Sequence, residues 1–96
     1  MAQRTRYVVA YDIRDPRRLR RVHQVAKDHG YPLQYSVFIC DLTTQEVVLM
    51  RSDVEARMKP SEDSVMVIDL GYPGDPGRFL FLGHHEKLPT TDAVIV

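Results

Sequence analysis

Hydrophobic positions near the start of the chain alternate between two apolar faces, as they do in a strand buried on both sides. One face carries Tyr7, Val9 and Tyr11, and the other carries Val8 and Ala10. The apolar run ends in the carboxylate of Asp12. The pattern therefore predicts a central strand that ends at Asp12, where a rigid element meets a loop.

A helix is predicted directly after this strand. Asp15 is a typical N-cap residue, and Pro16 suits the first helical position. The apolar side chains of the following residues form one stripe, which consists of Leu19, Val22 and Ala26 with Val25 beside it. Gly30 favours a helix end as the C′ residue, so the predicted helix covers Pro16 to His29.

The later hydrophobic runs predict three more strands and a second helix. The second strand covers Gln34 to Leu42, with Tyr35, Val37 and Ile39 on one face and Ser36, Phe38 and Cys40 on the other. Thr43 to Glu46 form a capping box, and the helix that follows places Val47, Met50, Val54 and Met58 toward the core until Pro60 ends it. The third strand covers Ser64 to Leu70, a loop rich in glycine and proline covers residues 71–77, and a short strand covers Arg78 to Leu82.

The element order predicts an α+β fold of the ferredoxin-like βαββαβ type. In this sandwich an antiparallel sheet carries two helices on one face, and the strands of residues 34–42 and 64–70 flank the first strand. The opposite sheet face is apolar as well, so a second subunit is expected to cover it. Ala93 to Val96 read as an additional C-terminal strand that pairs with a sheet edge, either its own or that of the partner.

Composition limits the possible classes of protein. A length of 96 residues predicts one domain, residues 1–96, and the net charge of zero conceals an uneven distribution. Residues 1–30 carry eight basic and three acidic side chains, whereas the remaining residues carry five basic and ten acidic ones. Cys40 is the single cysteine, which excludes an internal disulfide. With no membrane-length apolar run and a polar N-terminus, the protein is expected to be cytoplasmic.

Two groups of side chains are candidates for chemistry. Asp12 is either a functional carboxylate at a strand end or a structural one that accepts backbone hydrogen bonds. Arg17, Arg20 and Arg21 lie near a helix N-terminus, where cations oppose the helix dipole, so an anionic partner such as phosphate would favour them. The alternative is a solvated basic face. His84, His85 and Glu86 are poor metal ligands because adjacent side chains on an extended chain point in opposite directions.

Several stretches together resemble the CRISPR-associated Cas-two family. They are the residues Tyr11 to Asp15, the arginine-rich helix Arg17 to Val22, and Gly30 followed by Gln34 to Phe38. Their order and spacing agree with that family from about residue 5 to residue 70, and the C-terminal third agrees in outline.

The resemblance implies a ferredoxin-like homodimer that acts beside the larger integrase subunit in acquiring CRISPR spacers. It also implies a metal-dependent endonuclease activity on RNA or DNA, with Asp12 of each subunit as catalytic residue and ligand of Mg²⁺ or Mn²⁺. The other motif positions line the dimer cleft or the nucleic-acid face, and they are Tyr11, Arg17, Arg18, Arg20, Arg21, Ser36 and Phe38.

Three other functions remain open on the sequence alone. The chain could be a non-catalytic DNA-binding scaffold in which Asp12 is structural. It could also be a ribonuclease toxin related to virulence-associated protein D. A small-ligand regulatory domain is disfavoured, because such a domain has no need of the arginine-rich helix.

Overall fold

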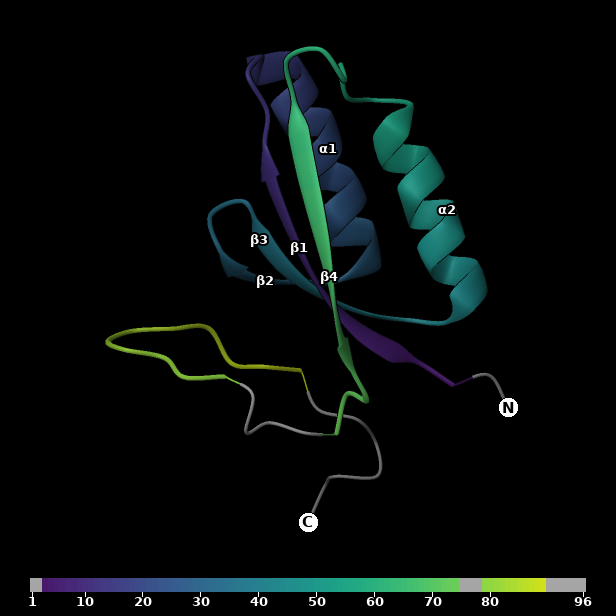
Figure 1. Cartoon of the computed structure of the whole chain (residues 1–96). Helices are drawn as coiled ribbons and strands as arrows, with labels where there is room; N and C mark the ends of the chain where they lie inside the picture. Colours follow the sequence, from purple (N-terminus) through teal and green to yellow (C-terminus); the bar gives the residue numbers. More distant parts are fainter. Residues whose placement is uncertain (1–2, 75–78, 90–96) are drawn as a thin grey trace.

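A computed structural model describes residues 3–74 and 79–89 of the chain. The elements in chain order are β1 (Thr5–Asp12), α1 (Pro16–His29), β2 (Tyr31–Gln34), β3 (Val37–Leu42), α2 (Thr44–Glu55) and β4 (Ser64–Gly71). All neighbouring strands are antiparallel, in the sheet order β2-β3-β1-β4. Both helices cover the same face of the sheet (Figure 1). This arrangement confirms the predicted α+β, ferredoxin-like fold, with β3 and β4 on either side of β1.

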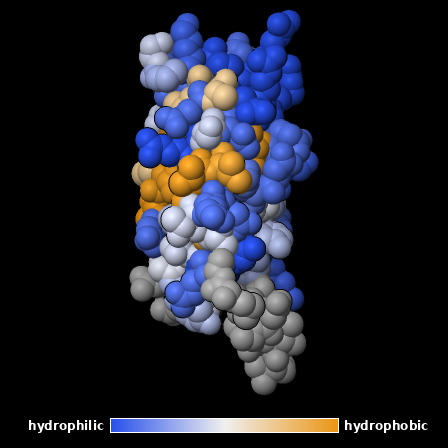
Figure 2. Space-filling model, turned by 90° about the vertical axis from the view of Figure 1, so that its right-hand side faces the viewer, coloured by the Kyte–Doolittle hydropathy of each residue, from blue (hydrophilic) through white to orange (hydrophobic). Residues whose placement is uncertain are grey.

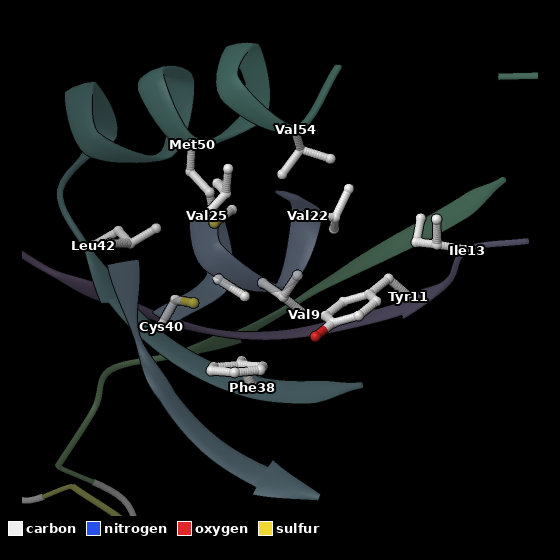
Figure 3. Close-up of a cluster of buried hydrophobic side chains, with 11 residues drawn as sticks. Val9, Tyr11, Ile13, Val22, Val25, Phe38, Cys40, Leu42, Met50 and Val54 are labelled. Carbon is white, nitrogen blue, oxygen red and sulfur yellow. The ribbon is translucent and has the colours of Figure 1, made fainter. Parts of the chain in front are cut away.

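The core lies between the helices and the sheet (Figure 3). Val9 and Tyr11 point into it from β1, Phe38 and Cys40 from β3, and the stripes of the two helices close it. The buried helix residues are Val22, Val25 and Ala26 of α1 and Met50 and Val54 of α2, as the helical spacing predicted. Burial raises the pKa of Cys40 to about 12, so this thiol behaves as a small apolar side chain.

The predicted second strand, Gln34 to Leu42, is wrong in its first part. Residues 31–42 form a β-hairpin in which Tyr35 and Ser36 are the turn between β2 and β3. Ser36 has a φ of 63°, which belongs to the left-handed region that a strand residue does not adopt. The chain therefore reverses at Tyr35, although Phe38 and Cys40 share a face as predicted.

Two other predicted elements differ from the observed ones, and a third falls outside the described residues. Helix α2 ends at Glu55 with Ala56 as its C-cap, before Pro60 is reached. Residues 79–82 form no strand; instead the rings of Phe79 and Phe81 stack with their centroids 5.7 Å apart. Residues Ala93 to Val96 lie outside the described part of the chain.

Gly30 ends α1 for a reason other than the predicted one. Its backbone is extended rather than left-handed, so it is the C-cap residue rather than C′. A Cβ atom at this position would collide with the backbone oxygen of Ile39 and with Sγ of Cys40. Gly30 therefore allows the end of α1 to approach β3 closely.

The sheet face opposite the helices is closed at one end and open at the other. At the closed end Arg6 is buried, donates hydrogen bonds to both carboxylate oxygens of Asp41, and donates a third at 2.8 Å to the backbone oxygen of Pro89. Toward the other end, Met66 and Ile68 of β4 are exposed, opposite Ala10 and Val8 of β1. The predicted uncovered apolar face is thus present on this half of the sheet.

The side of the molecule that carries α2 has an apolar groove. Figure 2 shows hydrophobic side chains gathered in a band across this side. Val47 and Met58 line the groove beside α2, and Val65 and Val67 line it from β4. Within residues 3–74 and 79–89, β4 pairs only with β1, so its outer edge is open. No described helix is long and apolar enough to cross a membrane.

Candidate functional site

Asp12 lies at the end of β1, on the open face of the sheet and opposite Ser64 of β4. Its side chain is 66% exposed, and its Oδ2 is 3.2 Å from the Arg14 guanidinium, which is equally exposed. Alternation along the strand places Asp12 on the same face as Val8 and Ala10. The carboxylate is therefore accessible to solvent, while the strand that carries it is fixed in the centre of the sheet.

The loop after Asp12 is held by a carboxylate that the sequence patterns did not single out. The Asp63 side chain is fully buried and accepts a hydrogen bond from the backbone N–H of Arg14 at 2.9 Å. It also accepts from the backbone N–H of Lys59 at 2.8 Å and from the guanidinium of Arg18. Asp63 therefore joins the β1–α1 loop, the first turn of α1 and the α2–β4 loop at one point.

Arg18 consequently has a different role from the other arginines of α1. Its Nε lies 2.7 Å from Oδ2 of Asp63, and its Nη2 lies 3.1 Å from Glu62. The guanidinium beside Asp63 holds the pKa of that carboxyl well below its usual range. Nε and Nη2 of Arg18 thus hold carboxylates in this structure, and the predicted nucleic-acid contact of Arg18 stays a prediction.

The N-terminus of α1 is capped as the sequence predicted. One carboxylate oxygen of Asp15 accepts from the backbone N–H groups of Arg17 and Arg18, each at 3.0 Å. The hydrogen bond from Arg18 is the largest cause that lowers the pKa of Asp15. The first turn contains no acidic residue besides this cap. The partial positive charge of the helix dipole at this end is therefore offset by no other carboxylate in the turn.

The basic surface consists of Arg17, Arg20 and Arg21, which line a shallow hollow on the outer face of α1 together with Gln24. All four side chains belong to exposed residues. Within the described ranges, none of the three arginines forms an ion pair with a carboxylate. Their guanidinium groups are available to an external anion, and a phosphate fits both their charge and their forked geometry.

Of the remaining predicted site residues, Tyr11 and Phe38 lie between the sheet and α1, whereas Ser36 lies in the hairpin turn. Phe38 is only 1% exposed, and Tyr11 stacks beside it with a centroid distance of 6.3 Å. Ser36 is part of the hairpin turn, where its backbone oxygen accepts from the N–H of Tyr11 at 3.0 Å. Phe38 and Tyr11 can therefore support the shape of a site but have little surface with which to touch nucleic acid.

His23 is a second residue that the sequence patterns did not single out. Its Nδ1 lies 2.6 Å from the phenol oxygen of Tyr11, and its ring meets the ring of Phe38 edge-on at 5.4 Å. Helical spacing alone assigns His23 only to the exposed side of α1. His23 is identified only by its contacts with Tyr11 and Phe38, which arise when α1 packs against the sheet in the folded chain.

Within residues 3–74 and 79–89, the carboxylates of one chain do not make a site for Mg²⁺ or Mn²⁺ at Asp12. Among the residues that the structure describes, no three His, Cys, Asp or Glu side chains are grouped closely enough to hold a metal ion. Asp63, the other carboxylate of this region, is already saturated by Arg18 and two backbone N–H groups. His84 to Glu86 likewise belong to no such group, and His85 instead stacks on Phe81 at 4.1 Å.

The fold and the site together define a small ferredoxin-like protein with an exposed carboxylate at a central strand end and a basic helix beside it. The chain belongs to the CRISPR associated protein Cas2 family, whose pattern it matches over residues 5–73. This match confirms the family resemblance that the motifs of the sequence carry.

Relatives with established names agree with this assignment. The chain is 43% identical over 65 residues to a CRISPR-associated endoribonuclease Cas2 of Rhodospirillum rubrum, an alignment that spans 68% of this chain and 64% of that protein. It is 36% identical over 89 residues to the CRISPR-associated endoribonuclease Cas2 of Thermus thermophilus, covering 91% of this chain and 94% of the relative. The crystal structure of Streptococcus pyogenes Cas2 superimposes with a TM-score of 0.73 at 30% identity, covering 81% of this chain and 99% of that one.

Proposed function

We propose that this chain is a homodimeric, metal-dependent endonuclease that cleaves RNA or DNA and acts with the larger integrase subunit in CRISPR spacer acquisition. The relatives' names as endoribonucleases support the nuclease activity. The observation that carries the proposal is the position of Asp12, exposed at the end of the central strand and on the uncovered sheet face.

A second copy of the chain is the partner that this position favours. Met66 and Ile68 are 54% and 41% exposed on the same face as Asp12, and burying such side chains stabilises an interface by about 1.5–3 kcal/mol each as an upper estimate. If two sheets pack face to face about a two-fold axis near this end, each subunit contributes one Asp12. The apolar contact and the shared carboxylate site then depend on the same packing.

The need for a metal follows from the charges of such a pair. Two carboxylates brought close together repel unless a cation neutralises them, and Mg²⁺ or Mn²⁺ accepts oxygen ligands of this kind. A bound divalent ion supplies an activated water and polarises a phosphate. For the residues of this chain, the Asp12 pair would hold the ion, and Arg14 would place positive charge 3.2 Å from each carboxylate.

The arginines of α1 provide the second part of the proposed function. Arg17, Arg20 and Arg21 form an exposed cationic surface at the N-terminal half of α1, the end of the helix that follows Asp12 by a short loop. Contacts with several phosphates would retain a nucleic acid without reading its bases. Substrate binding and cleavage would then use neighbouring but separate residues.

The variant Asp12→Asn tests this function. Purified parent and variant are compared on single-stranded RNA and on duplex DNA, with Mg²⁺, with Mn²⁺ and with a chelator. We expect the parent to cleave only with a metal, and the variant to lose cleavage while it remains folded. Asp28→Asn, which changes an exposed carboxylate of α1 that is bonded to Gln24, is the matched control and should cleave like the parent. Undiminished cleavage by pure Asp12→Asn would remove Asp12 from the mechanism.

A second measurement does not depend on cleavage. Because the two carboxylates repel, Mg²⁺ should strengthen dimerisation of the parent, and Asp12→Asn should dimerise equally with and without metal. Sedimentation of both proteins with Mg²⁺ and with a chelator gives this comparison. Equal metal dependence in the two proteins would contradict a shared Asp12 site.

A non-catalytic DNA scaffold is the second candidate function. The observation that favours it is that the basic surface of α1 is complete in one chain, whereas one chain has a single exposed carboxylate at the strand end. A parent that binds duplex DNA but cleaves no substrate with either metal would support the scaffold.

A further inference from the structure

The turn of the β2–β3 hairpin is held rigidly against the end of β1. Tyr35 and Ser36 form the turn, and the left-handed backbone of Ser36, with its φ of 63°, directs its oxygen to the N–H of Tyr11 at 3.0 Å. Ala10 and Val37 are the last paired residues of β1 and β3 at this end, and this bond extends the pairing by one residue on each side. The position of the turn is therefore fixed by β1 even though the turn itself lies at the surface.

Tyr35 presents its aromatic ring to solvent from this fixed turn. Its side chain is 85% exposed, the largest exposure of any tyrosine in the described residues. Burial is the main cause that raises the pKa of Tyr11, and the neighbouring Tyr35 phenol raises it further. Tyr11 lies in the core, whereas Tyr35 projects into solvent from the turn that the Ser36–Tyr11 hydrogen bond holds against the end of β1.

Helix α1 adds an oriented imidazole and a cation to the same region. The Nδ1 atom of His23 lies 2.6 Å from the Tyr11 phenol oxygen, and its ring packs edge-on against Phe38, which Figure 3 shows on the same side of the core as Tyr11. His23 is an exposed residue. Arg20 lies one helical turn earlier, on the same side of α1 and within the basic surface.

This combination of groups fits an unpaired nucleotide. An exposed ring can stack on a base of any sequence, and neighbouring cations can hold the phosphates on either side of that base. A base within a duplex is already stacked on both faces, so a single tyrosine ring has nothing to stack against there. A single exposed tyrosine is common on protein surfaces, but the turn that carries this one is hydrogen-bonded to Tyr11, whose phenol oxygen contacts His23 of the helix that carries the basic surface.

We propose that Tyr35, His23 and Arg20 form a stacking site for an unpaired nucleobase at the tip of the β2–β3 hairpin. The inference rests on the nucleic-acid binding proposed above, and it assigns the binding of single-stranded segments to a specific set of residues. Tyr35 stacks on the base, His23 offers its second ring nitrogen to the base edge or sugar, and Arg20 binds the adjoining phosphate. No bond is made or broken at this site.

The test measures binding of a fluorescent single-stranded oligoadenylate and of a fluorescent duplex of equal length, by anisotropy in the presence of a chelator so that cleavage does not interfere. Tyr35→Ala should weaken binding of the single strand about fivefold or more, because stacking on one aromatic ring usually has at least this effect. Binding of the duplex should change less than about twofold. Tyr35→Phe retains the ring and should bind the single strand like the parent.

Two further comparisons make the result specific. Tyr31→Ala removes another exposed tyrosine of the same hairpin, at the far end of β2, and should leave single-strand binding unchanged. An oligonucleotide that carries abasic positions should abolish the difference between parent and Tyr35→Ala. Tyr35→Leu keeps an apolar side chain without a ring and should bind as weakly as Tyr35→Ala, which separates stacking from any effect of the alanine on folding.

The outcomes distinguish this site from the function on which it rests. A parent that binds both nucleic acids while Tyr35→Ala and Tyr35→Leu bind the single strand equally well would overturn the stacking site alone. An equal loss in Tyr31→Ala would overturn it too. A parent that binds neither nucleic acid at low salt would overturn the proposed function itself, and the stacking site with it.

Discussion

Asp63 and Arg18 form an ion pair across 45 positions of the sequence, with Oδ2 and Nε 2.7 Å apart. The carboxylate is fully buried, and it also accepts from the backbone N–H groups of Arg14 and Lys59. Breaking such a pair on one side leaves a buried charge without its partner, which is strongly destabilising. The pair therefore holds the loop that follows Asp12 in place, and it links the position of that carboxylate to the stability of the domain.

Replacing Asp63 with alanine should lower the midpoint of thermal unfolding by about 5 °C or more, since two backbone N–H groups and a guanidinium would be left without their acceptor. Asp53→Ala, which removes an exposed carboxylate of α2, should have a much smaller effect. Circular dichroism during heating measures both changes. Equal midpoints for parent and Asp63→Ala would show that the buried carboxylate does not organise the two loops.

The same hydrogen bonds predict how stability depends on pH. Arg18 and the two backbone N–H groups lower the pKa of Asp63 in the folded chain below its ordinary value of 3.8. The ionised carboxylate is therefore favoured by folding, so its stabilisation is complete above pH 3.8 and is lost as the pH falls below that value. Urea unfolding between about pH 6 and pH 3 should show a smaller loss of stability in Asp63→Asn than in the parent. A parallel decline in the two proteins would contradict this account.

The arginines of α1 should separate into binding and structural residues. Replacing Arg17, Arg20 and Arg21 with glutamine should weaken binding to duplex DNA and lower the log–log salt slope by about 0.9 for each phosphate that the protein no longer neutralises. The folded chain should be equally stable or slightly more so, because these cations oppose the dipole of α1 and Arg17 and Arg21 repel each other at i,i+4.

Arg18→Gln is the matched control for these three substitutions. Its guanidinium holds Asp63 and Glu62, so we expect a lower unfolding temperature and a nearly unchanged salt slope for the fraction that remains folded. Anisotropy titrations over a range of salt concentrations give the slopes. A triple variant with the affinity and the salt slope of the parent would show that the three arginines form a solvated surface with no phosphate-binding role.

Much of the fold could be predicted because its signals are local. The alternation before Asp12, the cap formed by Asp15 and Pro16 and the box formed by Thr43 and Glu46 all depend on residues a few positions apart. The sequence does not indicate the β2–β3 hairpin, because neither turn residue is a glycine or an asparagine, the residues that usually mark a two-residue turn. The turn residues are Tyr35 and Ser36. In this turn Ser36 adopts the left-handed conformation itself, and the bond from Tyr11 holds it there.

The candidate site was predicted less completely, because its main contacts join distant positions. Asp12 and the exposed arginines could be found from their places at the ends of elements. Asp63 could not, since its partners lie up to 49 residues away, at Arg14. Motif membership also grouped Arg18 with its neighbours and Phe38 with surface residues, whereas the folded chain uses the first for an internal ion pair and the second as core.

The uncovered half of the sheet provides the last prediction. Met66 is 54% exposed on the open face, opposite Ala10, and in the proposed homodimer it is covered by the second sheet. Met66→Lys should leave the isolated chain folded, because the side chain is already exposed, and should weaken dimerisation about tenfold or more because less apolar surface is buried. Val48→Lys places the same charge on an exposed apolar position of α2 and should not affect the dimer. Sedimentation velocity at low micromolar concentration compares the three proteins. A parent that sediments as a monomer, or a Met66→Lys variant as dimeric as the parent, would rule out this sheet face as the interface and with it the pairing of two Asp12 carboxylates across that interface.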